Sequence, residues 1–412
     1  MKVDAKLWIN EPLTTIETTQ KRKGVEYTTS DWWWKSKESY RDYDIVCSAW
    51  RHVAVVCPRL RRSESRGTYR TEIFQIMKDS IIRDDQTYEI LGSDISCNLG
   101  STNVVKLMES PNFGKSVRTM LRALTYVTDN SNIDSVPTVK NGNDRYHSVG
   151  LGAMNLHGYL AKNHIEYGSP EALEFTDIYF MLLNFWTLAE SNDIARERGE
   201  TFFEFEKSKY ADGTYFDMYL NAPDFEFKHE KVKKLFEGIF IPKHQDWKRL
   251  KENIMRYGLY NAYRLATAPT GSISYINEAT ASIHPITQRI EERTEGKRGK
   301  VYYPVPYLSD DTIPYYKTAY DIDQRKIINT YAIAQKHVDQ GMSMTLFFRE
   351  ELPEGMYEWK ADSEYPTKKT TRDLSILRNY AWKKGIKSVY YIRTFTDDGD
   401  MIGANECESC SI

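Results

Sequence analysis

The sequence has few cysteines, almost no net charge and no long apolar run, and each shortage excludes a class of protein. Five cysteines in 412 residues are too few for a disulfide scaffold. A formal net charge of −2 gives no general attraction to nucleic acid or to an anionic membrane surface. The chain contains no apolar stretch of about 18 residues, and its first residues lack the apolar core of a secretory signal. We therefore expect a cytoplasmic globular protein that binds neither nucleic acid nor membranes.

The first 70 residues differ in composition from the rest of the chain. They carry 14 Lys and Arg against 9 Asp and Glu, and they hold five of the nine tryptophans. Three of these tryptophans are consecutive, at 32–34, which suits neither a helical face nor a strand face. Cys47 and Cys57 lack the spacing of zinc ligands, so a zinc site there is only a weak alternative. We predict that residues 1–70 form a poorly ordered extension.

Regular hydrophobic patterns begin near Thr71 and continue to about residue 395. Periods of three and four residues predict helices at 114–128, 148–163, 170–198, 229–239, 244–257, 311–319, 323–340 and 371–384. Short apolar runs predict strands at 272–276, 343–348 and 388–392. Helices that alternate with short buried strands indicate an α/β fold with a largely parallel sheet. The polar residues 396–412 are predicted to form a mobile tail.

Two cysteines near the end of the chain are the clearest local chemical signal. Cys407 and Cys410 are three residues apart, and a lone pair supplies only two of the four ligands that zinc requires. On a mobile tail, the pair is better interpreted as a dithiol shuttle, with two incidental cysteines as the alternative. The neighbouring Glu406 and Glu408 disfavour the thiolate, which suits an electron carrier better than a primary nucleophile.

Three further features are ambiguous when each is taken alone. Cys97 in DISCNLGS has the context of an ordinary core residue. The segment 268–274, APTGSIS, predicts a turn that leads into a strand and could bind a phosphate, although an ordinary turn is the commoner case and a Walker A lysine is absent. Tyr390 and Tyr391 should point to opposite faces of a regular strand, but could stack and relay an electron and a proton where the strand is irregular.

Taken together and in order, these features resemble the C-terminal half of the large catalytic subunit of class I ribonucleotide reductase, most like class Ib. The resemblance covers about residues 71–412. It is carried by the motifs TEIFQ, DISCNLGS, HSVGLGAMNLHGYLA, APTGSISYINEATASIHP, HVDQG, GIKSVYYIR and the CESC tail. It implies the second half of a ten-stranded α/β barrel, which reduces the 2′-carbon of ribonucleoside diphosphates by a radical mechanism for DNA synthesis.

The resemblance also assigns roles to individual residues. Glu72 matches the general acid/base carboxylate, and Cys97 matches one of the two thiols that reduce the substrate. Cys407 and Cys410 match the tail pair that re-reduces the resulting disulfide and is recharged by thioredoxin or a glutaredoxin-like protein. Two further groups match the stacked radical-relay pair and the loop that holds the substrate phosphates. They are Tyr390 and Tyr391, and Pro269, Thr270, Gly271, Ser272 and Ile273.

The remaining implications concern partners and cofactors. No metal and no cofactor is expected in this chain, because a small beta subunit of the family carries a di-iron or di-manganese tyrosyl radical. The family's N-terminal half contributes the thiol partner of Cys97 and most of the binding sites for the allosteric effectors ATP and dNTP. We expect the chain to require both that half and the small subunit.

The sequence departs from the family pattern beside Glu72. The family has Asn-x-Cys-x-Glu there, with the radical on the cysteine, whereas this chain reads Thr68-Tyr69-Arg70-Thr71-Glu72. Arginine cannot form a thiyl radical, so the chain alone is expected to be inactive. Translated intervening sequence from a split gene, or a misassigned start, would explain residues 1–70. Two alternatives remain open: a non-catalytic complementing or regulatory subunit that binds the small subunit, and a thiol carrier that uses only the CESC tail.

Overall fold

The computed structural model describes four strands before residue 91 and most of the chain from residue 93 onward. The described residues are 16–22, 25–31, 80–82, 88–90, 93–96, 98–131, 133–294, 300–353, 356–361 and 365–395. The chain divides into two compact units, and each is described by itself. One unit comprises 1–96 and 131–145, and the other comprises 97–130 and 146–412.

The first unit contains two antiparallel strand pairs and a helix. β1 (Ile16–Arg22) pairs with β2 (Val25–Asp31), and β3 (Ser80–Ile82) pairs with β4 (Tyr88–Ile90). Sequence patterning did not predict β1 and β2, and the other residues of the expected extension 1–70 lie outside the described part of the chain. The helix α7 (Pro137–Tyr146) is fastened near its start, where the Asp94 N–H donates to the Thr138 carbonyl at 3.1 Å.

Parallel strand segments form the centre of the second unit. β5 (Asn98–Asn103) pairs in parallel with β6 (Val149–Met154). Parallel bridges then join Leu151 to Leu265 and Thr267 to Met342, and β9 (Thr345–Arg349) pairs in parallel with β10 (Tyr391–Phe395). The order of segments is therefore β5, β6, 265–267, β9 and β10. The predicted α/β architecture is confirmed, as an open half-barrel whose outer strands β5 and β10 have no further strand partner among the described residues.

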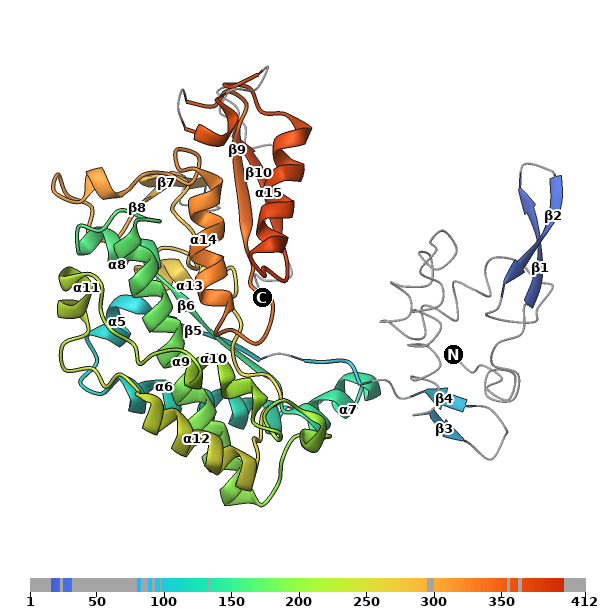
Figure 1. The fold of residues 1–412 in the computed structure, drawn as a ribbon. Helices are drawn as coiled ribbons and strands as arrows, with labels where there is room; N and C mark the ends of the chain where they lie inside the picture. The colour runs from blue at the N-terminus through green and yellow to red at the C-terminus, as the bar shows by residue number, and fades with distance from the viewer. Residues whose placement is uncertain are drawn as a thin grey trace. The chain divides into compact units, whose positions relative to one another are not determined.

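Helices cover this sheet, and the 29-residue helix α9 (Pro170–Arg198) lies at their centre (Figure 1). It contacts α6 (Phe113–Asp129), α12 (His244–Tyr257) and α14 (Gln324–Gln335). The other elements outside the sheet are α5 (Val104–Met108), α8 (Leu156–Lys162), α10 (Asp217–Leu220), α11 (Glu230–Leu235), α13 (Gly271–Ile276), α15 (Thr371–Lys383) and the hairpin of β7 (Ile290–Thr294) and β8 (Lys300–Pro304). None of the helices in the described residues is long and apolar enough to cross a membrane.

Local signals in the sequence explain the limits of α9. Ser169 caps its start, because its Oγ accepts the Ala172 N–H at 3.2 Å. Gly199 ends it with a φ of 67°, a left-handed conformation that glycine adopts readily. The predictions of helices at 170–198, 114–128, 244–257 and 371–384 are confirmed to within about a residue at each end.

Two predictions of secondary structure are wrong in ways that affect the candidate site. The predicted helix 148–163 begins with the fully buried strand β6, and only residues 156–162 are helical. Gly152 lies in this strand, and an added Cβ there would clash with the carbonyl oxygen of Ala266. Glycine therefore allows β6 to lie close to the neighbouring segment. The predicted strand 272–276 is the helix α13, because Ser274 N–H bonds to the Thr270 carbonyl and turns the chain into a helix.

Other predicted boundaries also shift. The predicted helix 311–319 is a short 3₁₀ turn at Ile313–Tyr315, and the helices predicted at 229–239 and 323–340 are shorter than expected. The strand predicted at 388–392 begins at Tyr391 instead. Sequence patterning missed the β7–β8 hairpin, whose short alternating strands contain many charged residues.

Residues 131–145 form an excursion from the second unit. They belong to the first unit, whereas the residues on either side of them belong to the second. Asp129, at the end of α6, lies 3.2 Å from His147 Nδ1 and accepts a hydrogen bond from the Tyr260 hydroxyl at 3.1 Å. The His147 ring stacks on Tyr260 with 4.0 Å between ring centroids, and Arg198 forms an ion pair with Asp129 at 2.5 Å. These contacts close the base of the excursion within the second unit.

Candidate functional site

The loop after the third parallel segment lies at the carboxyl edge of the sheet. Thr267 makes the last bridge of that segment, and residues 268–270 lead directly into α13. In open α/β sheets, ligands bind beyond the carboxyl ends of the strands. The predicted phosphate loop therefore occupies a ligand-binding position of the fold, although it leads into a helix rather than into a strand.

Thr270 fixes the shape of this loop. It is buried and has φ 52° and ψ 29°, a left-handed conformation that is unusual for a β-branched residue. Its Oγ1 accepts the Ser282 N–H at 2.7 Å, and its carbonyl accepts the Ser274 N–H at 3.1 Å. The surrounding structure thus holds Thr270 in a strained conformation through two hydrogen bonds.

The next three residues present backbone donors to solvent. Gly271, Ser272 and Ile273 are exposed, whereas Pro269 is half-buried. Residues 271–273 form the first turn of α13, where N–H groups have no acceptor within the helix. An added Cβ on Gly271 would meet no atom within 4 Å, so the backbone can be approached closely. Because α13 has only six residues, its dipole adds little, and any anion would be held by the N–H and hydroxyl groups themselves.

An amide network centred on the buried Asn155 holds the far end of α13 against the sheet. Asn155, which follows β6, donates from Nδ2 to Asn103 Oδ1 at 3.0 Å, at the end of β5. Its Oδ1 accepts the Thr280 N–H at 3.0 Å. Asn103 in turn donates to the Asn277 carbonyl at 3.3 Å, just after α13. The ends of two parallel strands therefore determine where α13 lies.

A buried ion pair supports the start of the same segment. The Arg264 side chain is fully buried, and its Nη2 lies 3.2 Å from Asp339 Oδ2. The two Asp339 oxygens also accept the N–H groups of Arg264 and Leu265, each at 2.9 Å. Burial raises the pKa of Asp339, and the Arg264 charge opposes that rise. Arg264 also donates to Asn184 and Thr187 of α9, each at 3.0 Å, which joins the sheet to its central helix.

Two histidines in the predicted family motifs have structural partners. His157 is fully buried, its Nδ1 accepts the Ile286 N–H and its Nε2 donates to the Tyr315 carbonyl, each at 3.0 Å. Burial lowers the pKa of His157 to about 4. Burial likewise lowers the pKa of His284 to about 4, and its Nδ1 lies 2.8 Å from the Pro285 carbonyl oxygen. Both rings are therefore neutral at pH 7.

Tyr390 and Tyr391 lie together where β10 begins. Their ring centroids are 4.1 Å apart and the ring planes are inclined by 56°, so the pair is in contact but is not stacked in parallel. Tyr390 precedes the regular strand, and its N–H donates to the Met344 carbonyl at 2.7 Å. Regular alternation therefore starts only at Tyr391, which allows the two neighbouring rings to meet. Tyr390 is 39% exposed, so the pair can be reached from solvent.

Several predicted site residues lie outside the described part of the chain. They are Glu72, Cys97, Cys407 and Cys410, together with Arg70 at the departure from the family pattern. Among the residues that the structure does describe, no group of three or more His, Cys, Asp or Glu could hold a metal ion.

Sequence reasoning missed the residues that position the loop. Asn155 had a readable signal, since it directly follows the apolar stretch that forms β6, whereas Asn103 is the last residue of the mostly polar strand β5. Arg264 and Asp339 gave no local signal, because they are 75 positions apart in the sequence. Asp339 belongs to the HVDQG motif, which supported the family resemblance but had no role assigned to it.

The fold is an open, parallel α/β half-barrel, and the loop 268–270 lies at the carboxyl edge of its sheet. The family profile described as the ribonucleotide reductase barrel domain matches residues 71–392. The chain therefore belongs to the ribonucleotide reductase family, which is a family of oxidoreductases.

Curated relatives agree with this assignment. The ribonucleoside-diphosphate reductase subunit alpha of Bacillus subtilis is 44% identical over 342 residues, which is 83% of this chain and 45% of that protein. The protein of the same name from Mycoplasma pneumoniae is 42% identical over 353 residues, covering 83% of this chain and 46% of the relative. That of Helicobacter pylori is 32% identical over 324 residues, covering 77% and 38% respectively. The chain thus spans about half the length of the curated relatives it matches, or less.

Proposed function

We propose that this chain supplies the C-terminal part of a ribonucleoside-diphosphate reductase alpha subunit. The observation that carries the proposal is the position of APTGSIS, which joins the carboxyl end of a parallel strand to α13 in a chain of this family. The N–H groups of residues 271–273 would bind the substrate diphosphate. The names of the relatives, which act on ribonucleoside diphosphates, support this choice of substrate.

The chemistry assigned to the chain is a two-electron reduction. Cys97 and a second thiol would lose two hydrogens and form a disulfide, while the 2′-hydroxyl leaves as water and a C–H bond replaces the C–O bond. Cys407 and Cys410 would then reduce that disulfide by thiol–disulfide exchange and receive electrons in turn from thioredoxin or a glutaredoxin-like protein. Glu72 would hold or move the proton at the ribose.

The radical would come from a small beta subunit with a di-iron or di-manganese tyrosyl radical. Tyr390 and Tyr391 would relay it, because adjoining phenols 4.1 Å apart between ring centroids can exchange an electron. Arg70 cannot carry a thiyl radical, so turnover would require a cysteine at that position and the family's N-terminal half. Allosteric ATP and dNTP would act mainly through that other half.

Binding and turnover test different parts of the proposal. Calorimetry on the full chain should show binding of CDP or ADP and much weaker binding of cytidine or adenosine, because the contacts are made to phosphate. No difference between diphosphate and nucleoside would contradict the assignment of the loop.

Turnover of CDP by the chain alone, with reductant and loaded small subunit, should be at background. Addition of the N-terminal half together with Arg70→Cys should be needed for deoxycytidine diphosphate to appear. Product formed by the unchanged chain and abolished by Cys97→Ser would contradict the inactivity of the single chain.

The second candidate is a non-catalytic subunit that binds the small subunit and complements or regulates another alpha chain. Arg70 at the radical position is the observation that favours it. Such a chain would bind the small subunit while Arg70→Cys restored no activity under any condition, and this result would separate the two candidates.

A further inference from the structure

The β7–β8 hairpin has two different faces, each with one tyrosine and one glutamate. The strands are antiparallel, and Glu291 is paired with Tyr303 while Glu292 is paired with Tyr302. Because side chains alternate along a strand, these two cross-strand pairs point to opposite faces. Glu291 and Tyr303 are half-buried, whereas Glu292 and Tyr302 are exposed. The hairpin thus has an inner pair and an outer pair of the same composition.

The inner pair contacts α13. The Tyr275 hydroxyl donates to Glu291 Oε2 at 2.5 Å, and the Tyr275 ring lies 4.8 Å from the Tyr303 ring between centroids. In the outer pair, Glu292 instead forms an ion pair with Lys300 of the same hairpin at 2.6 Å. The inner face therefore contacts the helix, whereas the glutamate of the outer face pairs with a lysine of the hairpin itself.

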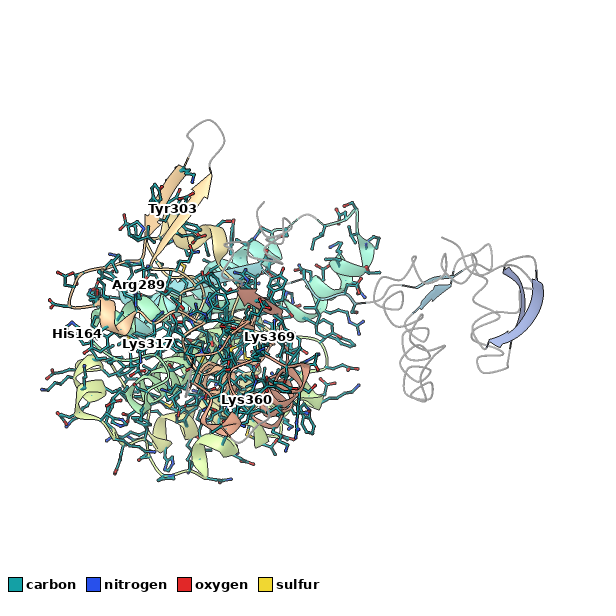
Figure 2. All side chains as sticks on the ribbon, turned by 90° about the horizontal axis from the view of Figure 1, so that it is seen from above. His164, Arg289, Tyr303, Lys317, Lys360 and Lys369 are labelled. Atoms are coloured by element: carbon teal, nitrogen blue, oxygen red, sulfur yellow. The ribbon has the colours of Figure 1, made fainter. Side chains whose placement is uncertain are left out.

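The base of the hairpin is anchored to the body of the second unit. Val305 N–H donates to the Arg289 carbonyl at 2.9 Å, and Arg289 Nε donates to the Tyr316 carbonyl at 3.0 Å. Figure 2 shows Arg289 near the base of the hairpin and Tyr303 farther along the projecting strands. A rigid base allows the inner face to resist movement of Tyr275.

The sheet and the hairpin hold α13 at different points. Thr270 and the Asn103–Asn155 network fix the two ends of the helix, while Tyr275 contacts the hairpin at a position between them. The inner pair joins the hairpin to α13 at Tyr275, so loss of that pair would let α13 tilt about its ends. The N–H groups of residues 271–273 move with the helix.

We infer that Glu291 and Tyr303 are positioning residues for the substrate loop, and that they act through Tyr275. This inference rests on the proposed function, because it takes 269–273 to be the loop that holds the substrate diphosphate. This clamp, formed by the contacts of Glu291 and Tyr303 with Tyr275, holds the helix in place and does not touch the substrate itself. Its loss should therefore weaken binding of the diphosphate without changing recognition of the nucleoside.

The test compares inner and outer substitutions in the full chain. Glu291→Ala and Tyr303→Ala should each weaken CDP binding about tenfold, whereas the outer variants Glu292→Ala and Tyr302→Ala should leave it within about twofold of the wild type. Glu291→Gln keeps an oxygen acceptor for the Tyr275 hydroxyl, so it should restore most of the affinity. All five variants should unfold at similar temperatures, since the hairpin projects from the core.

Amide hydrogen exchange gives a readout that needs no ligand. Exchange at residues 274–277, whose N–H groups follow the first turn of α13, should be at least fivefold faster in Glu291→Ala than in the wild type, and unchanged in Glu292→Ala. Equal exchange in the inner and outer variants would overturn the inference. If the wild type fails to bind CDP while the exchange difference is present, the assignment of the substrate loop is wrong and the clamp on α13 stands.

Discussion

Arg264 and Asp339 form a buried ion pair that joins two neighbouring segments of the sheet, although the two residues are 75 positions apart in the sequence. The carboxylate also accepts two backbone N–H groups at the start of the third segment. This arrangement pairs the two charges directly inside the second unit. Replacing both partners by apolar residues is far less harmful to a protein than removing one of them.

Asp339→Asn is expected to destabilise the second unit strongly. The amide nitrogen cannot accept the N–H group that one carboxylate oxygen now accepts, and the Arg264 charge loses its partner. Urea unfolding should show a loss of about 3–5 kcal/mol in the free energy of unfolding. Asp310→Asn at an exposed position is the control and should change it by less than about 0.5 kcal/mol. A variant with Arg264→Met and Asp339→Leu should be more stable than Asp339→Asn, and the reverse order would contradict this account of the pair.

The stability of the second unit should fall on mild acidification because of His157. Its folded pKa is lowered to about 4, whereas an unfolded histidine has a pKa of about 6.5. Between these values the unfolded state binds a proton that the folded state does not, so stability falls as the pH falls from 6.5 towards 4. This one group should contribute a loss of about 2 kcal/mol between pH 7 and pH 5.

The matched variant for this effect is His157→Asn, in which the side chain cannot titrate. It should be less stable than the wild type at pH 7, because the bond to Tyr315 is lost, but its stability should fall less between pH 7 and pH 5. Chemical unfolding at the two pH values measures both quantities. An equal fall in the two proteins would show that other groups dominate the response to acid.

Gly271→Ala separates helix stability from ligand binding. The added Cβ has free space, and alanine favours a helix over glycine by up to about 1 kcal/mol, so the variant should be at least as stable as the wild type. If a phosphate lies against this backbone, the same Cβ should weaken CDP binding about tenfold. Ser272→Ala adds no atom, so it should have a smaller effect. Unchanged affinity in Gly271→Ala would place the ligand elsewhere.

Removal of either phenol of the tyrosine pair should stop radical transfer but leave the fold intact. In an assembly with the N-terminal half, Arg70→Cys and the small subunit, Tyr390→Phe or Tyr391→Phe should reduce CDP turnover by at least a hundredfold. Binding of CDP and the unfolding temperature should not change, because phenylalanine keeps the ring contact. Tyr302→Phe serves as an exposed tyrosine control. Substantial turnover in either pair variant would exclude the relay.

The purified chain is expected to self-associate through the edge of β5 that has no strand partner among the described residues. Leu99 in that strand is 54% exposed, and Ile276 at the end of α13 is 85% exposed. An unpaired strand edge beside exposed apolar side chains favours association with other chains. Sedimentation should detect oligomers that disappear when the family's N-terminal half is co-expressed. A monodisperse monomer that does not respond to that half would contradict the interpretation of β5 as a strand that pairs with it.

The sequence predicted long elements well and the candidate site only in part. Helix α9 was predictable because its cap at Ser169 and its end at Gly199 are local signals. Residues 272–276 were misassigned because the conformation of Thr270, which starts the helix, depends on its bond to Ser282 twelve residues away. The roles of Asn155 and Glu291 depend on contacts between distant segments. Periodicity within a short window contains no information on such contacts.

The contact between Asp129 and His147 makes the geometry of the sheet independent of the number of residues between them. Because α6 and β6 are fastened to each other at the base of the excursion, the strands do not depend on how many residues lie between 130 and 146. Inserted sequence at 131–136 would lengthen the excursion and leave the register of β5 and β6 unchanged. For protein engineering, this makes the excursion the natural place to introduce a reporter or an affinity tag without touching the substrate loop.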